Sequence, residues 1–151
     1  MSSVSGLIGN FGQTNYGAAK AGIAGFSRSL SLEMAKYKCP VNTISPGAAT
    51  RLTIDLMKAA GREVKPDDWS QGPQQIAPII AWVCSNEANE ITNQIFHVSS
   101  GTVGIMQQPA VIKSFKNNEL WSMEKLNQVM PELVEAKKNH DKEVEKKGEP
   151  S

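Results

Sequence analysis

Tyr16 and Lys20 are the pair of side chains in this 151-residue chain whose types and spacing could do chemistry. They lie four residues apart, so a helix would place both on one face. An ammonium group beside a phenol stabilises the phenolate and lowers a tyrosine pKa from about 10 toward neutrality. Such a tyrosine can exchange a proton with a carbonyl or hydroxyl group. An ordinary surface pair has the same spacing, and the spacing alone favours that interpretation.

Other sequence features accompany this pair. Ser3 lies thirteen residues before Tyr16, in the run SVSG, and the pair itself lies in the run NYGAAKAG. The run VNTISPG follows and begins at Val41.

The hydrophobic pattern indicates which elements position these residues. Residues 1–13 are small and polar with three glycines, which predicts a loop. From about Thr14 to Lys36 apolar residues recur at three- and four-residue spacing, and we expect a helix there. Each glycine in that helix weakens it by about 1 kcal/mol relative to alanine, so close approach of another backbone is expected to offset the cost.

Alternating helices and strands predict an α/β fold with parallel strands. The strand candidates are residues 41–45 and 94–99, with helix candidates at 52–60 and 74–84 between them. Two short strands cannot form a sheet that is buried on both faces. We therefore expect the chain to be about half of a larger fold.

Charge is distributed unevenly along the chain. Residues 1–35 carry three charged side chains, whereas residues 113–151 carry sixteen of the thirty-one in the whole chain. The first part is therefore expected to be packed or to form an interface, and the last part to be solvated. In that last part Ser122 is expected to cap a helix through Met130, and Pro131 to open a second helix.

Composition excludes several classes of protein. The formal net charge of +1 argues against a nucleic-acid-binding protein, which normally has a basic excess. No apolar run approaches the roughly 18 residues that span a membrane, and the first residues do not resemble a secretory signal. Two cysteines do not make a disulfide framework, so a cytoplasmic location is expected.

The runs that contain Ser3, Tyr16 and Lys20, together with the run that begins at Val41, resemble the short-chain dehydrogenase/reductase family. The matching stretches are SSVSGLIGNFGQTNYGAAKAGIAGF, VNTISPGAATRLT and IFHVSSG, which together cover roughly residues 2–101. The resemblance implies the C-terminal half of a Rossmann-like doubly wound parallel sheet. We expect this partial domain at 1–106 and a helical, charged C-terminal extension at 107–151. The loop PGAATRLT and the tail resemble the 3-hydroxyacyl-CoA dehydrogenase domain of peroxisomal-type multifunctional β-oxidation proteins and its bacterial relatives, so a peroxisomal location is the alternative in a eukaryote.

The resemblance assigns catalytic roles by position. Tyr16 would be the general acid/base, and Lys20 would lower its pKa and hydrogen-bond the nicotinamide ribose. Ser3 would hold the substrate carbonyl. The reaction would be reversible hydride transfer between a secondary alcohol and NAD or NADP. The implied substrate is a 3-hydroxyacyl or 3-oxoacyl thioester, as the coenzyme A or acyl-carrier-protein derivative.

The resemblance also implies a cofactor site and a partner. Tyr16 and Lys20 would contact the cofactor, and a loop would line its nicotinamide end; the loop residues are Pro46, Gly47, Ala48, Ala49 and Thr50. In the family the helix that carries the tyrosine packs against its copy in another subunit. A homo-oligomer through the helix at 14–36 is therefore expected.

The sequence departs from the family in one large way. It has no opening strand followed by a glycine-rich turn and helix, which would hold the pyrophosphate of the dinucleotide. The run Gly6-x-x-Gly9-x-x-Gly12 does not have the required spacing. We expect the site for NAD or NADP to be incomplete and the chain alone to be inactive. The alternative is a non-catalytic fragment that serves oligomerisation or interaction.

Two further residues have more than one interpretation. Arg51 could contact an acyl-CoA phosphate or carbonyl, or it could be solvated or ion-paired. His97 alternates with Phe96 and Val98 on the expected strand, which favours a structural histidine over a ligand.

Overall fold

The computed structural model describes the whole chain except residues 51–53, 60, 62–70 and 149–151. The chain divides into two compact units, Met1–Gln108 and Pro109–Ser151, beside the boundary expected between 106 and 107. No helix among the described residues is both long and apolar enough to cross a membrane.

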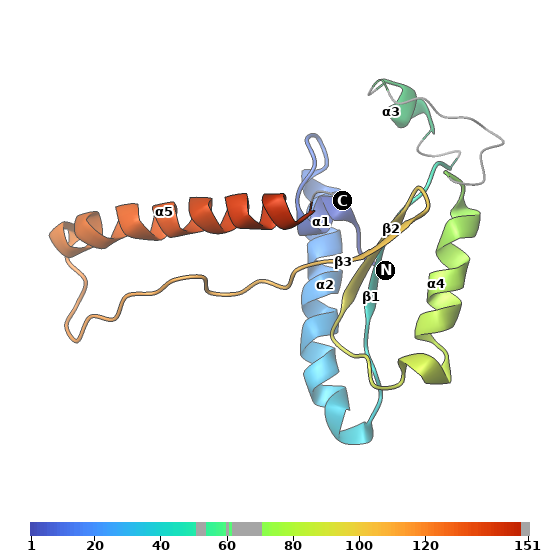
Figure 1. Ribbon diagram of the computed structural model, residues 1–151, viewed down its shortest axis with the longest axis horizontal. Coiled ribbons are helices and arrows are strands. Elements are labelled where there is room, and N and C mark those ends of the chain that lie inside the picture. The colour runs from blue at the N-terminus through green and yellow to red at the C-terminus, as the bar shows by residue number, and fades with distance from the viewer. Residues whose placement is uncertain (51–53, 60, 62–70, 149–151) are drawn as a thin grey trace. The chain divides into compact units, whose positions relative to one another are not determined.

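The first unit contains a three-stranded sheet in the order β1-β2-β3 (Figure 1). Its strands are β1 (Thr43–Gly47), β2 (Ile95–Ser99) and β3 (Thr102–Ile105). β1 and β2 run parallel, with Ile44 opposite Phe96. Parallel strands need a crossover connection, and the chain between β1 and β2 contains helices. The pairing therefore confirms the expected α/β fold with parallel strands.

β3 is a strand that the sequence analysis does not predict. It runs antiparallel to β2 and is joined to it by Ser100 and Gly101. Both residues have positive φ angles, 48° and 79°. A two-residue hairpin of this hand requires positive φ at both positions, and glycine supplies the second at no steric cost.

The described residues of the first unit also form helices. The α-helices are α1 (Val4–Leu7), α2 (Thr14–Met34), α3 (Ile54–Ala59) and α4 (Ile76–Val83), with short 3-10 turns at Ala35–Tyr37, Pro73–Gln75 and Asn86–Ala88. α2 confirms the long helix predicted from its apolar spacing. It ends in the first of these turns, after which Lys38 adopts a left-handed conformation.

The prediction of a loop over residues 1–13 is wrong at α1. Ser3 is extended, with φ −160° and ψ 153°, and its hydroxyl oxygen accepts a hydrogen bond from the backbone N–H of Ser5 at 3.3 Å. This is an N-cap of the usual kind, which satisfies a donor in the first turn. A helix of four residues is too short to show apolar periodicity, so the sequence gives no signal for it.

The apolar core lies between α4 and one face of the sheet. Ile44, Phe96 and Val98 pack with Ile76 of α4, and all four are buried. Thr43 and Ser45 of β1 alternate with Ile44 and are buried as well. Figure 1 shows α2 and α4 on opposite sides of the sheet. Both faces of β1 and β2 are therefore covered, as in parallel sheets generally.

Asn42 ties the beginnings of β1 and β2 together. Its side-chain amide donates to the carbonyl of Ile91 at 2.6 Å, and its side-chain oxygen accepts from the backbone N–H of Gln94 at 3.0 Å. The backbone N–H of Thr43 also donates to the carbonyl of Gln94 at 2.8 Å. One side chain thus replaces a rung of the ladder where the strands begin.

The second unit consists of residues 109–122 and α5 (Met123–Gly148). The hydroxyl of Ser122 accepts from the backbone N–H of Lys125 at 3.2 Å, which confirms the expected cap. A hydrogen bond from its own backbone N–H, and a second from the Ser122 hydroxyl, hold the pKa of Glu124 below its ordinary value.

The prediction that Pro131 opens a second helix is wrong, because α5 continues through it. An internal proline removes one helix hydrogen bond and costs about 3 kcal/mol. Residues on both sides of the proline are partly buried or ion-paired. Lys113 forms an ion pair with Glu132 at 3.0 Å, and half-buried Leu126 and Leu133 lie seven residues apart on one face.

Replacing Asn42 by alanine should lower the free energy of unfolding by about 1–3 kcal/mol, because the Ile91 carbonyl and the Gln94 N–H lose their partner. Asn42→Asp keeps the acceptor for Gln94 and should lie between alanine and wild type. Urea unfolding measures both. The control is Asn89→Ala, since Asn89 is exposed and bonds only weakly to Asn86, at 3.5 Å. Equal stability of Asn42→Ala and wild type would contradict this account.

Candidate active site

Tyr16 and Lys20 lie in the first turns of α2 and point the same way. The Nζ atom of Lys20 is 5.5 Å from the centroid of the Tyr16 ring. Tyr16 is 44% exposed, so its ring is half open to solvent, while Lys20 is half-buried. The structure therefore brings together the two groups that the spacing of four residues places on one helix face.

Ser3 belongs to the first three residues of the chain, which lie in space between β1 and α2. The preceding residue, Ser2, donates its backbone N–H to the carbonyl of Ile44 on β1 at 2.8 Å. Lys20 Nζ donates to the carbonyl of Met1 at 3.3 Å. Lys20 thus contacts both Tyr16 and the backbone of the segment that carries Ser3. The catalytic roles of Ser3, Tyr16 and Lys20 remain predictions.

Two glycines allow this segment and α1 to approach α2 closely. A Cβ atom on Gly6 would lie 2.5 Å from the backbone nitrogen of Ala21 and 2.6 Å from the carbonyl carbon of Lys20. A Cβ atom on Gly17 would lie 2.9 Å from the carbonyl oxygen of Ser5. Gly17 therefore has the close backbone neighbour that was expected to offset its cost in the helix, and that neighbour belongs to the same chain. Gly22 has no such neighbour within 4 Å.

The residues predicted to line the nicotinamide end lie where β1 ends. Pro46 and Gly47 are the last residues of β1, and Ala48, Ala49 and Thr50 follow it, all half-buried. Ligands of parallel α/β sheets bind at the carboxyl ends of the strands. The parallel pairing places Gly47 opposite Ser99 at this edge. A nicotinamide site at this edge, lined by these residues, remains a prediction.

A side chain in place of the Gly47 hydrogen would require Ser99 to shift. A Cβ atom on Gly47 would lie 2.6 Å from the hydroxyl oxygen of Ser99. Beyond this point the backbone N–H of Ala49 donates to the carbonyl of Gln71 at 2.6 Å. Arg51, for which acyl-CoA contact was one interpretation, lies outside the described residues.

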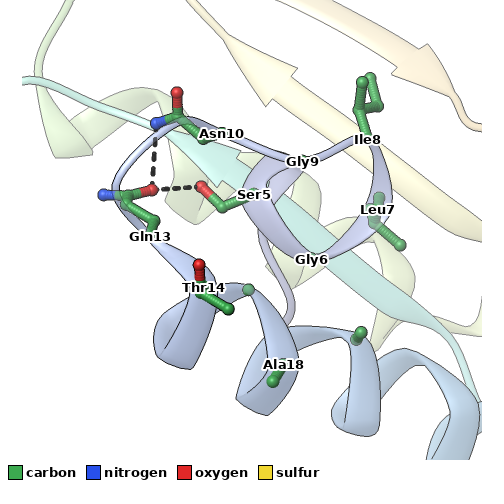
Figure 2. A pocket seen from close by; sticks show the side chains of 11 residues that line it. Ser5, Gly6, Leu7, Ile8, Gly9, Asn10, Gln13, Thr14 and Ala18 are labelled. Atoms are coloured by element: carbon green, nitrogen blue, oxygen red, sulfur yellow. Dashed lines mark hydrogen bonds between the residues drawn. The ribbon is translucent and has the colours of Figure 1, made fainter.

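The structure reveals a cavity that the sequence analysis does not predict. It has a volume of about 340 Å³ and lies between α1, the loop that follows it and the start of α2 (Figure 2). Gln13 holds the loop, because its side-chain oxygen accepts from the hydroxyl of Ser5 at 2.6 Å and from the amide of Asn10 at 3.0 Å. None of the eleven residues that line the cavity is charged, and Ser3, Tyr16 and Lys20 are not among them.

The remaining polar candidates have structural contacts. Nδ1 of His97 lies 3.0 Å from the carbonyl oxygen of Ser45, so that nitrogen carries the proton and donates. This contact supports the structural interpretation of His97. No group of three or more His, Cys, Asp or Glu side chains that could hold a metal occurs in the part of the chain that the structure describes.

Comparison with known proteins extends this picture. Residues 1–103 match the family described as enoyl-(acyl carrier protein) reductase. The peroxisomal hydratase-dehydrogenase-epimerase of Neurospora crassa is 41% identical over 105 residues, which are 68% of this chain and 11% of that protein. The 3-oxoacyl-[acyl-carrier-protein] reductase of Escherichia coli is 42% identical over 103 residues, which are 66% of this chain and 42% of that protein.

A solved structure is similar over most of the chain. It is the crystal structure of a short chain dehydrogenase from Mycobacterium avium, with a TM-score of 0.72 and 32% sequence identity. The similarity covers 89% of this chain and 44% of that one. The chain spans less than half the length of the curated relatives it matches.

The glycine contacts lead to a paired prediction. Gly6→Ala should destabilise the protein by about 1–3 kcal/mol, because the new methyl group overlaps backbone atoms of α2 and forces α1 away. Gly22→Ala adds the same methyl group where nothing lies within 4 Å, and it should stabilise the helix by about 0.5–1 kcal/mol. Thermal and urea unfolding measure both variants. Changes of the same sign and size at the two positions would show that α1 is not packed against α2 as described.

Proposed function

Because the chain belongs to the short-chain dehydrogenase/reductase family, we propose that it supplies the proton-transfer part of an NAD(P)-dependent oxidoreductase that interconverts secondary alcohols and ketones. The observation that carries the proposal is the position of Lys20. Its ammonium group lies 5.5 Å from the Tyr16 ring centroid and 3.3 Å from the Met1 carbonyl oxygen. The Lys20 ammonium group therefore lies beside both Tyr16, the proposed general acid/base, and the segment that carries Ser3.

Each of the three side chains has a role in the proposed reaction. In the reducing direction the Tyr16 hydroxyl donates a proton to the substrate carbonyl oxygen, and in the oxidising direction the phenolate takes it back. Ser3 donates a hydrogen bond to the same oxygen and orients the carbonyl. Lys20 stabilises the phenolate by its positive charge. A bound nicotinamide dinucleotide would supply or accept the hydride.

The proposed substrate is a 3-hydroxyacyl or 3-oxoacyl thioester. Two relatives support this choice by their names, one a hydratase-dehydrogenase-epimerase of peroxisomes and the other a reductase of 3-oxoacyl-[acyl-carrier-protein]. One of these names prints an acyl-carrier-protein substrate, and the resemblance of the sequence to 3-hydroxyacyl-CoA dehydrogenase domains adds coenzyme A thioesters. Both thioesters are therefore candidates, and the proposed location is cytoplasmic or peroxisomal accordingly. Comparison of acetoacetyl-CoA with the carrier-protein derivative in one assay decides between them.

The position of residues 46–50 supports a site for one end of the cofactor. Pro46 to Thr50 lie at the carboxyl edge of β1, where ligands of parallel α/β sheets bind. The sequence contains no Gly-x-Gly-x-x-Gly run to hold a pyrophosphate at a helix N-terminus. We therefore propose that residues 1–151 alone bind NAD or NADP weakly and do not turn over. Full activity would require a pyrophosphate-binding segment in the same assembly.

Tyr16→Phe tests the catalytic role. In the longest polypeptide that contains these residues, the variant should lower kcat by about 10²- to 10⁴-fold, because the proton donor is lost while the ring remains. The measurement is the loss of NADH or NADPH absorbance in the presence of acetoacetyl-CoA. Tyr37→Phe is the matched control, since Tyr37 is also exposed and has the Nζ atom of Lys36 4.8 Å from its ring. Undiminished kcat in Tyr16→Phe would refute the proposal.

A second candidate function is a non-catalytic module that associates with its own copies through α2. The observation that favours it is apolar exposure along that helix: Phe26 is 66% exposed and Leu32 is 76% exposed. Charge is sparse there, since Lys20, Arg28 and Glu33 are the charged residues of α2. We propose this association as a feature of the enzyme as well, so the two functions differ in turnover and not in assembly.

Phe26→Ser should therefore shift the protein toward a smaller species in sedimentation velocity experiments, because it removes apolar area from the proposed interface. The control is Tyr37→Ser, which changes an aromatic residue of similar exposure, 65%, beyond the end of α2. It should leave the sedimentation coefficient unchanged. A wild-type monomer at every concentration tested would contradict association through α2.

A further inference from the structure

Ser2 joins the sheet to α2 directly beside the candidate site. The residue is 2% exposed. Its backbone N–H donates to the carbonyl of Ile44 on β1 at 2.8 Å, and its hydroxyl donates to the carbonyl of Lys20 on α2 at 2.8 Å. One buried residue thus fixes the edge of a strand and a turn of the helix at the same time.

The hydroxyl bond is additional to the helix's own bonding. A carbonyl within an α-helix already accepts from the N–H four residues later, so α2 does not need Ser2 in order to be helical. What the bond adds is a fixed position of α2 relative to residues 1–3. It spans 18 residues of sequence and ends on the backbone of the lysine of the proposed proton-transfer pair.

Three independent contacts converge on Lys20 from the same segment. Its carbonyl accepts from Ser2, its Nζ donates to the carbonyl of Met1 at 3.3 Å, and its Cβ lies beside Gly6. A Cβ atom on Gly6 would come within 2.7 Å of the Lys20 Cβ. The lysine is therefore held at both its backbone and its side chain, whereas the Tyr16 side chain is half open to solvent.

We propose that Ser2 is a positioning residue for the Tyr16–Lys20 pair. Its hydroxyl fixes the backbone of Lys20, and through Lys20 it sets where the ammonium group lies against the Tyr16 ring and how far both lie from Ser3. Ser2 does not touch the substrate, since it is buried and its hydroxyl bonds to Lys20. The catalytic meaning of this placement rests on the proposed function, but the placement itself can be measured without turnover.

The test compares Ser2→Ala with Ser31→Ala. Ser31 is a matched control because it is 3% exposed and its hydroxyl donates to another α2 carbonyl, that of Arg28, at 2.7 Å. Each variant loses one hydroxyl bond to a carbonyl of α2, but only the bond lost in Ser2→Ala joins the helix to residues 1–3. Circular dichroism and thermal unfolding establish that each variant is folded.

The readout is the NMR signal of the Lys20 ε-methylene group in the full chain labelled with ¹³C-lysine. The Tyr16 ring should displace this signal from those of solvated lysines, and Tyr16→Leu identifies it by removing the displacement. We expect Ser2→Ala to lose the displacement and Ser31→Ala to keep it. Retention of the displacement in Ser2→Ala, or equal loss in both variants, would overturn the proposal.

A measurement on the wild-type chain keeps the proposal testable if Ser2→Ala does not fold. The Ser2 hydroxyl proton should exchange slowly with water and give a nuclear Overhauser effect to Lys20, and rapid exchange without that effect would overturn the proposal. Where the longest polypeptide turns over, Ser2→Ala should also lower kcat by about 100-fold, and Ser31→Ala should not change it. If Tyr16→Phe is fully active, the proposed function fails while the NMR result on Ser2 stands by itself.

Discussion

The close packing of residues 1–7 against α2 is the constraint on which the rest of the site depends. Gly6 and Gly17 remove the side chains that would separate the two backbones, and the Ser2 hydroxyl then bonds across the contact. Backbone groups that approach this closely leave little freedom for either element. The packing of residues 1–7 against α2 therefore fixes where Ser3, Tyr16 and Lys20 lie relative to one another.

The sheet positions the Ser3 segment and the loop that follows Gly47. Parallel pairing of β1 and β2 brings Gly47 and Ser99 to one carboxyl edge, and Ser2 bonds to the free edge of β1 at Ile44. The Ser3 segment and the loop after Gly47 thus both take their positions from β1. Proton transfer and cofactor contact are therefore expected at one site, because the hydride and the proton must reach the carbon and the oxygen of the same carbonyl group.

Much of this arrangement could be predicted from the sequence, because it depends on local periodicity. The apolar spacing of α2 and the four-residue step from Tyr16 to Lys20 are local signals, and the structure follows them. What the sequence did not show depends on contacts far along the chain. Pro131 lies inside α5 although a proline normally begins or ends a helix, and the bond from Ser2 to Lys20 joins residues 18 apart. No pattern in a single sequence encodes such a partner.

The central claim is that Ser3 and Tyr16 act on the same substrate oxygen. The most direct measurement is a crystal structure of the longest polypeptide that contains this chain, with a 3-oxoacyl thioester and a nicotinamide dinucleotide bound. The account predicts that the Ser3 and Tyr16 hydroxyl oxygens both lie about 2.7–2.8 Å from the 3-oxo oxygen of the thioester. A thioester whose 3-oxo group contacts neither hydroxyl would contradict it.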